Sequence, residues 1–298
     1  MKGMAFSPAH ITGFFKAELD GKQKPEFQGS LGAGFSIQSG VVTSVEIEES
    51  DYTDFKIKVT GYQSDNTQVS EFVIKEFLKN IEGNYFLNIH HDIKVPVGYG
   101  FGCSAAVALS LAFALNQAFG TGFSNEKLGR MAHVAEVSCQ TGLGDVLASY
   151  HGGFEIRTRG GAPGIGSIKK ISTKSHSAIV ICFAPISTKQ FMKERMSSIN
   201  GLGGKMVNKL IESEDIGEFH DCSIEFADYV NIITPKMRMV IDDLQKNGIK
   251  CGVALFGETI FTLIPHSLED KVFDILKKYN DGIIIKSKID DLGARLVS

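Results

Sequence analysis

Three glycines alternate with other residues at Gly98, Gly100 and Gly102, shortly before Ser104. A strand is expected to end near His91, and an alanine-rich helix is expected to begin directly after the last glycine. Such a loop can turn its backbone N–H groups toward one point, and the helix adds the free N–H groups and positive dipole end of its first turn. The spacing therefore predicts a polyphosphate-binding loop, with the Ser104 hydroxyl available to a phosphate-bound magnesium ion.

Two other phosphate-binding patterns do not fit the sequence. A Walker A loop requires Gly-Lys followed by Ser or Thr, and the later segment 201–206 fails because Met206 stands where the hydroxyl is needed. The dinucleotide spacing Gly-x-Gly-x-x-Gly also differs from the loop at 98–102. A purely structural role is the alternative, because glycines also let a strand and a helix pack closely.

Two acids and a histidine follow on the next expected helix and at its end. His133 and Glu136 are three residues apart, so a helix places them on one face. The helix is expected to break at Gly142, which puts Asp145 in a turn or at the start of the next helix. Two such carboxylates can divide the work of holding a cation and handling a proton. The alternative is that Glu136 is a solvated acid and Asp145 a helix N-cap.

A cationic candidate lies in the segment 152–159, which alternates as a strand does. Arg157 and Arg159 would then share one face with Glu155. A guanidinium can bind both oxygens of a carboxylate, so Arg157 is a candidate for binding an acidic substrate. The alternative is that both arginines are solvated or paired with Glu155.

The elements that must position these residues are strands and helices in blocks. Strands are expected at 4–6, 35–37, 41–48, 55–60, 85–91 and 178–183, with a hairpin at 252–256 and 259–264. Helices are expected at 67–78, 104–119, 125–139, 188–195, 205–211, 216–230, 235–247 and 268–278. Ser124 is expected to cap the helix that starts at 125. This arrangement predicts an α+β fold rather than repeated βαβ units, with a boundary near residue 170.

The motifs resemble those of the GHMP kinases, the family of galactokinase, homoserine kinase and mevalonate kinase. The segment 95–106, Val-Pro-x-Gly-x-Gly-x-Gly-Cys-Ser-Ala-Ala, is similar to the phosphate loop of the family, with Cys103 where the first of two serines usually stands. The segment 7–15 is similar to the first motif of the family. Together, 7–13, 29–34 and 141–145 most closely resemble the archaeal pantoate kinases, a branch of this family.

The resemblance implies a two-domain GHMP fold. Residues 1–170 would form the N-terminal ATP-binding domain, with the architecture of ribosomal protein S5 domain 2, and residues 171–298 a C-terminal α/β sandwich. It implies transfer of the γ-phosphoryl group of ATP, with Mg²⁺, to the 4-hydroxyl of (R)-pantoate, giving 4-phosphopantoate for coenzyme A biosynthesis. The alternatives are a homoserine- or mevalonate-type kinase of the same family and a non-catalytic binding or regulatory protein with this fold.

The resemblance also implies a role for each candidate residue. Asp145 would orient or deprotonate the attacking hydroxyl, and Ser104 and Glu136 would hold Mg²⁺. The acceptor would be bound by Ser30, His133 and Arg157. The nucleotide would be bound by Pro96, Gly98, Gly100, Gly102, Cys103, Ser104 and Ala105. One departure is the segment 250–259, which keeps only Gly252 and Gly257 where many family members have a third glycine-rich motif.

Composition sets the remaining expectations. The chain has 298 residues, 43% of them hydrophobic, and a formal charge of −3, which indicates a globular protein and argues against nucleic-acid binding by bulk positive charge. Five scattered cysteines without a Cys-x-x-Cys pair indicate reduced, packed thiols. The N-terminus lacks the apolar core of a secretory signal, and the apolar stretch 103–115 is too short to cross a bilayer. We therefore expect a cytoplasmic protein without membrane or nucleic-acid partners; the sequence leaves open whether it forms a homodimer.

Overall fold

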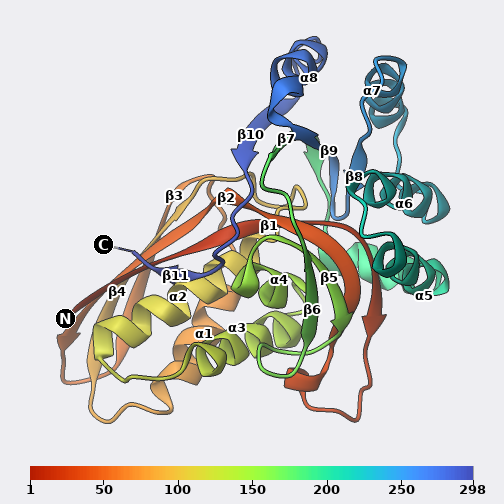
Figure 1. Ribbon diagram of the computed structural model, residues 1–298. Helices are drawn as coiled ribbons and strands as arrows, with labels where there is room; N and C mark the ends of the chain where they lie inside the picture. The colour runs from red at the N-terminus through yellow and green to blue at the C-terminus, as the bar shows by residue number, and fades with distance from the viewer. Residues whose placement is uncertain (298) are drawn as a thin grey trace.

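The computed structural model describes residues 1–297. Within them the chain forms one seven-stranded and one four-stranded β-sheet, and α-helices cover both (Figure 1). The mixture of strand and helix blocks confirms the predicted α+β fold.

The first sheet is built around a long hairpin. Its strands are β1 (Lys2–Glu18), β2 (Gly29–Glu49), β3 (Asp54–Gly61), β4 (Tyr85–Ile93), β5 (Phe154–Arg159), β6 (Ser167–Ile171) and β11 (Arg295–Leu296). Their order is β11-β1-β2-β4-β3, with β5 paired to β2 and β6 to β5; only β3 and β4 are parallel. One part of β2 pairs with β4 and another with β5, so the hairpin joins both ends of the sheet.

The strands β1 and β2 are much longer than the predicted strands at 4–6, 35–37 and 41–48. Along most of β1, consecutive side chains are buried because both faces of the strand are covered. Burial on both faces removes the alternation of apolar and polar residues by which a half-exposed strand is recognised. The sequence pattern therefore underestimated the length of these two strands.

Helices α2 (Cys103–Phe119) and α4 (Asp145–His151) pack directly on the first sheet, and α1 (Gln68–Leu78) and α3 (Asn125–Cys139) pack against α2. The short 3-10 helix η1 (Pro25–Phe27) lies between β1 and β2 in the chain. The predicted helices over 67–78, 104–119 and 125–139 are thus confirmed to within a residue. Ser124 caps α3 as predicted, because its hydroxyl accepts the Lys127 N–H at 3.2 Å. Helix α2 is buried around most of its circumference and forms the centre of this layer.

The second sheet has the order β10-β7-β9-β8 and is antiparallel throughout. Its strands are β7 (His176–Pro185), β8 (Gly252–Ala254), β9 (Gly257–Pro265) and β10 (Ile283–Lys288). It is accompanied by α5 (Thr188–Ser213), α6 (Ile216–Tyr229), α7 (Pro235–Lys246), α8 (Glu269–Leu276) and the 3-10 helix η2 (His266–Leu268). The predicted hairpin of β8 and β9 is confirmed; β6, β10 and β11 were not predicted.

Helix α5 corrects a prediction. The sequence predicted two short helices separated by the glycines at 201–204, whereas the structure has one helix of 26 residues. A Cβ atom at Gly203 would lie 2.0 Å from the Phe15 carbonyl oxygen of β1. The glycine therefore allows a close approach of helix and strand instead of ending the helix.

The chain changes from the first sheet to the second between Ile171 and His176, and its last strand, β11, returns to pair with β1. The division into domains 1–170 and 171–298 stays a prediction. Throughout residues 1–297, every helix is too short or too polar to span a bilayer. All five cysteines are free, in agreement with the expected reduced thiols.

Candidate active site

The glycine loop has a backbone that other residues rarely adopt. Gly98, Gly100 and Gly102 have φ angles of 85°, 84° and 55°, and Gly102 is the N-cap of α2. These positive values disfavour any residue with a Cβ atom. Together with Cys103 and Ser104, the three glycines line a cavity of about 530 Å³, and the start of α2 faces this space.

The turn between β8 and β9 lies against the glycine loop. A Cβ atom at Gly100 would lie 2.4 Å from the Leu255 carbonyl oxygen, and one at Gly257 would lie 2.5 Å from that of Tyr99. The Leu255 N–H donates to the Thr12 carbonyl at 3.1 Å. The segment with few glycines at 250–259 is thus the part of the second sheet that backs the loop.

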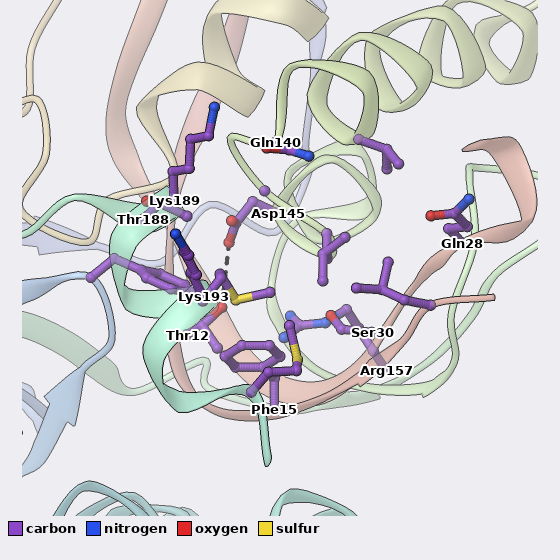
Figure 2. A pocket seen from close by; sticks show the side chains of 18 of the residues that line it. Thr12, Phe15, Gln28, Ser30, Gln140, Asp145, Arg157, Thr188, Lys189 and Lys193 are labelled. Carbon is purple, nitrogen blue, oxygen red and sulfur yellow. Dashed lines mark hydrogen bonds between the residues drawn. The ribbon is translucent and has the colours of Figure 1, made fainter. Parts of the chain in front are cut away.

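A second cavity, of about 610 Å³, meets the first at Asp145. Residues common to both walls are Thr12, Gln140, Asp145, Thr188, Lys189 and Phe256. Figure 2 shows Asp145 near the middle of the second cavity, with Lys189 and Lys193 of α5 on one side and Ser30 and Arg157 on the other. Asp145 thus stands between a space next to the glycine loop and a space next to a guanidinium.

Asp145 is the first residue of α4, but its side chain does not cap that helix. Its Oδ1 lies 2.8 Å from His10 Nδ1 and accepts a hydrogen bond from the Thr12 hydroxyl at 3.3 Å. Burial by itself would raise the pKa of Asp145, but His10 and Arg157 outweigh it and hold the pKa below its usual value. The N-cap alternative is therefore wrong, and Asp145 is an ionised carboxylate held in place.

His10 connects Asp145 to the strand that carries Arg157. Its Nε2 lies 3.0 Å from Glu155 Oε1, and Arg157 Nη1 donates to the same oxygen at 2.5 Å. Burial by itself would lower the pKa of His10, but the Glu155 and Asp145 carboxylates raise it above its usual value. Arg157 is paired with Glu155, as one of the alternatives proposed, and it also lines the second cavity. Arg159, beyond a bulge in β5, is exposed.

Glu136 lies behind the wall of the first cavity and is only 1% exposed, so the solvated-acid alternative is wrong. Its Oε1 accepts the Thr141 hydroxyl at 2.6 Å, and its Oε2 has no hydrogen-bond partner among residues 1–297. Burial raises the pKa of Glu136 to about 7, and the nearby hydroxyls of Ser104 and Thr141 offset this only in part. A buried carboxylate oxygen without a partner beside a serine hydroxyl fits a hard cation such as Mg²⁺.

The other predicted site residues lie at different depths. Ser30 is on the wall of the second cavity, near Arg157 (Figure 2). His133 is buried outside that wall and bonds through Nε2 to the Gln28 carbonyl at 2.8 Å, two residues before Ser30. Its predicted contact with the acceptor stays a prediction.

Three residues predicted to bind the nucleotide are buried. Cys103 is at the cavity wall, but burial raises the pKa of its thiol to about 12, so it packs as a small apolar residue. Pro96 and Ala105 are buried and are not part of the described cavity wall. They can shape the loop and the first turn of α2 without touching a ligand in this conformation.

Sequence reasoning did not assign roles to His10, Thr12 or Glu155. Alternation along a strand places His10 and Thr12 on one face, so their spacing was an available signal. Lys189 and Lys193 were missed as well; they are four residues apart at the start of α5, which places them on one side of that helix. Their nearness to Asp145 depends on how α5 packs against β1.

Comparison with known proteins agrees with this geometry. A model of the GHMP kinases N terminal domain matches residues 68–153. The chain is 31% identical over 279 residues to the pantoate kinase of Methanocaldococcus jannaschii, covering 91% of this chain and 96% of that one. It is 28% identical to the pantoate kinase of Thermococcus kodakarensis, with 93% and 92% covered. A solved structure, described as a phosphotransferase related to the CoA biosynthesis pathway, has a TM-score of 0.87 at 25% identity and covers 100% of this chain and 99% of its own.

Proposed function

The chain belongs to the pantoate kinases of the GHMP family, and we propose that it transfers the γ-phosphoryl group of ATP to the 4-hydroxyl of (R)-pantoate in the cytoplasm. The observation that carries the proposal is the junction of two cavities at Asp145. One cavity offers a glycine loop and a helix N-terminus to a triphosphate. The other offers a buried guanidinium to a carboxylate.

Phosphoryl transfer requires mainly positioning and charge stabilisation, so few residues suffice. The loop glycines and the first turn of α2 would hold the phosphates. Ser104 and Glu136 would hold Mg²⁺, which would neutralise charge on the β- and γ-phosphates. A site of one carboxylate and one hydroxyl suits Mg²⁺ because this ion is usually completed by substrate phosphates and water.

Asp145 would orient the acceptor hydroxyl and receive its proton. The bond from the pantoate 4-oxygen to the γ-phosphorus forms while the bond to the β-phosphate oxygen breaks, and ADP leaves. Because the pKa of Asp145 is held below its usual value, the carboxylate is ionised at neutral pH and can accept this hydrogen bond. Thr12 donates to the same carboxylate and fixes its direction.

The second cavity, called the acceptor cavity below, fits an acid that carries a branched apolar group. Arg157 and Ser30 supply polar contacts on one side, while Phe15, Leu143, Met192, Met196 and Phe256 supply apolar walls. Pantoate has a carboxylate and two methyl groups on one carbon, so it matches both parts. Burying two methyl groups contributes about 2 kcal/mol, enough to distinguish pantoate from an unbranched acid.

A coupled assay with ATP and Mg²⁺ tests the proposal on a panel of pantoate, homoserine and mevalonate. We expect kcat/KM for pantoate to exceed that for the other two acceptors by at least about 10²-fold. A preference for homoserine or mevalonate would assign the chain to another kinase type. Nucleotide binding without transfer to any of the three would favour a non-catalytic protein.

A further inference from the structure

Four ionisable side chains contact one another in the order Arg157, Glu155, His10 and Asp145; the two outer ones line the acceptor cavity, and the two inner ones are buried behind its wall. Neighbouring members are separated by 2.5, 3.0 and 2.8 Å between their closest atoms. His10 and Glu155 are fully buried and Arg157 is 1% exposed. Charges in such surroundings act on one another more strongly than charges in water.

We propose that Glu155 and His10 are positioning residues that couple binding of the acceptor carboxylate at Arg157 to the action of Asp145. This inference rests on the proposed function, in which Arg157 binds that carboxylate. The Oε1 atom of Glu155 is shared, since it accepts the Arg157 hydrogen bond and also faces His10 Nε2. A change of charge at Arg157 therefore changes the pull of Glu155 on His10.

His10 transmits this pull because both of its ring nitrogens face carboxylate oxygens. A neutral imidazole has one N–H and can donate to only one of them, whereas an imidazolium donates to both. The upward shift of the His10 pKa, which the Glu155 and Asp145 carboxylates cause against the effect of burial, favours the imidazolium. The imidazolium in turn keeps Asp145 ionised and directed toward the acceptor.

Glycines that pack tightly against His10 and Arg157 restrict the positions of these two side chains. A Cβ atom at Gly34 would lie 2.5 Å from His10 Nε2, and one at Gly144 would lie 2.7 Å from Arg157 Nε. The His10 ring and the Arg157 guanidinium are therefore packed against the backbone. Among residues 1–297, Arg157 Nε has no hydrogen-bond partner although it is buried. The guanidinium thus keeps a donor for a ligand while Nη1 is on Glu155.

The coupling has a direction. When an acceptor carboxylate binds Arg157, it competes with Glu155 for the guanidinium. The Glu155 carboxylate then attracts His10 more strongly and favours its imidazolium form. In that form His10 donates to Asp145 as well, so its interaction with Asp145 is also strengthened. The acceptor carboxylate should therefore increase kcat as well as affinity.

Glu155→Gln tests the coupling because it keeps the shape of the side chain and removes its charge. Arg157 then loses a competing carboxylate, so the Kd for pantoate is expected to fall about threefold to tenfold. His10 loses one of its two acids, so kcat is expected to fall about tenfold or more. Titration calorimetry with a non-hydrolysable ATP analogue gives Kd, and the coupled assay gives kcat. A purely structural role would instead raise Kd and lower kcat together.

Glu48→Gln is the matched control, since Glu48 is an exposed acid on β2, and it should change neither quantity. A test on the unaltered protein replaces pantoate by its carboxamide, which lacks the charge. We expect kcat at saturating amide to be at least about tenfold below that for pantoate. Unchanged kcat with the amide, or weaker pantoate binding by folded Glu155→Gln, would overturn the coupling. Absence of any pantoate turnover by the unaltered protein would reject the proposed function instead.

Discussion

Asp145 differs from the other acids near the site because it touches both cavities and remains ionised. Glu155 accepts a hydrogen bond from Arg157 and faces His10, and Glu136 accepts one from Thr141 and lies near Ser104. The three carboxylates thus differ in their neighbours: Asp145 has a histidine and a hydroxyl, Glu155 an arginine and the same histidine, and Glu136 hydroxyls. Different surroundings give one residue type different tasks.

Replacing Asp145 tests its role most directly. Asp145→Asn keeps the size of the side chain and removes the charge that orients the hydroxyl and accepts its proton. We expect kcat to fall at least about 10²-fold, with the circular dichroism spectrum and melting temperature close to those of the unaltered protein. Asp291→Asn, an exposed acid outside both described cavity walls, serves as the control. Near-normal turnover of Asp145→Asn would remove Asp145 from the mechanism.

Burial of Glu136 is expected to lower the stability of the folded protein at neutral and higher pH, although the proposed Mg²⁺ site requires this acid. Its pKa is raised by burial from 4.5 to about 7, so the folded protein holds this proton more tightly than the unfolded chain. The resulting stabilisation is complete below pH 4.5 and is lost as the pH rises through about 7. Gln resembles the protonated acid at every pH. Without Mg²⁺, we expect Glu136→Gln to raise the free energy of unfolding by about 2 kcal/mol at pH 8.

Urea unfolding at pH 5 and pH 8 measures this effect, and the gain should be much smaller at pH 5. The same variant should lose most of its Mg²⁺-dependent turnover, because the negative charge proposed to hold the cation is gone. Equal stability of the two proteins at both pH values would show that Glu136 is not strained by burial.

At the scale of elements, the turn between β8 and β9 packs against the loop from β4 to α2 and fixes its position. The loop provides the N–H groups, while the turn limits where the loop can lie. Helix α3 and its C-terminal turn act similarly. Gln140 ends the helix with a φ of 58°, and the following glycines carry the chain from Glu136 to Asp145 within nine residues. These short connections place both acids beside the start of α2.

Gly100→Ala tests the requirement for glycine in the loop. The added Cβ atom would lie 2.4 Å from the Leu255 carbonyl oxygen, at a φ of +84°. The loop must then shift, and we expect KM for ATP to rise at least about tenfold. Gly122→Ala is matched in backbone strain, with a φ of +66°, but its Cβ atom meets nothing within 4 Å. It should leave KM for ATP unchanged; equal effects of both variants would trace the loss to general instability.

At the scale of the whole molecule, the last segment of the chain ties the two sheets together. After β10 the chain crosses to the first sheet, where the Asp290 N–H donates to the Ser36 carbonyl and its carbonyl accepts from Gly153. The buried Asp290 carboxylate receives two hydrogen bonds from Arg295, at 3.0 and 2.9 Å, and one each from the Leu292 and Gly293 N–H groups. This pairing directs β11 onto β1, so the second sheet and its turn stay in place against the glycine loop.

Asp290→Ala should loosen this connection. Removing this carboxylate leaves two backbone N–H groups and the partly exposed Arg295 guanidinium without their acceptor, and we expect the free energy of unfolding to fall by about 2 kcal/mol. The neighbouring Asp291 is exposed, so Asp291→Ala is expected to change stability by less than about 0.5 kcal/mol. Denaturant titration of both variants makes the comparison. A similar small loss for both would show that the Asp290–Arg295 pair does not hold the sheets together.

Local spacing determined much of the local geometry in advance. The alternation of Gly98, Gly100 and Gly102 indicated the loop, and the face shared by Glu155 and Arg157 followed from the strand period. The helix boundaries at Ser124 and Cys139 also followed from capping and periodicity. These features depend on neighbours within a few residues, which the order of amino acids specifies directly.

Only the tertiary structure decided which distant residues meet. His10 contacts Asp145 and Glu155 across 135 and 145 positions of the chain, and no local pattern encodes those partners. The full length of β1, the continuity of α5 through its glycines and the return of β11 likewise depend on what covers each element. Residue spacing is set by covalent geometry, whereas long-range contacts result from burying the faces of several elements at once.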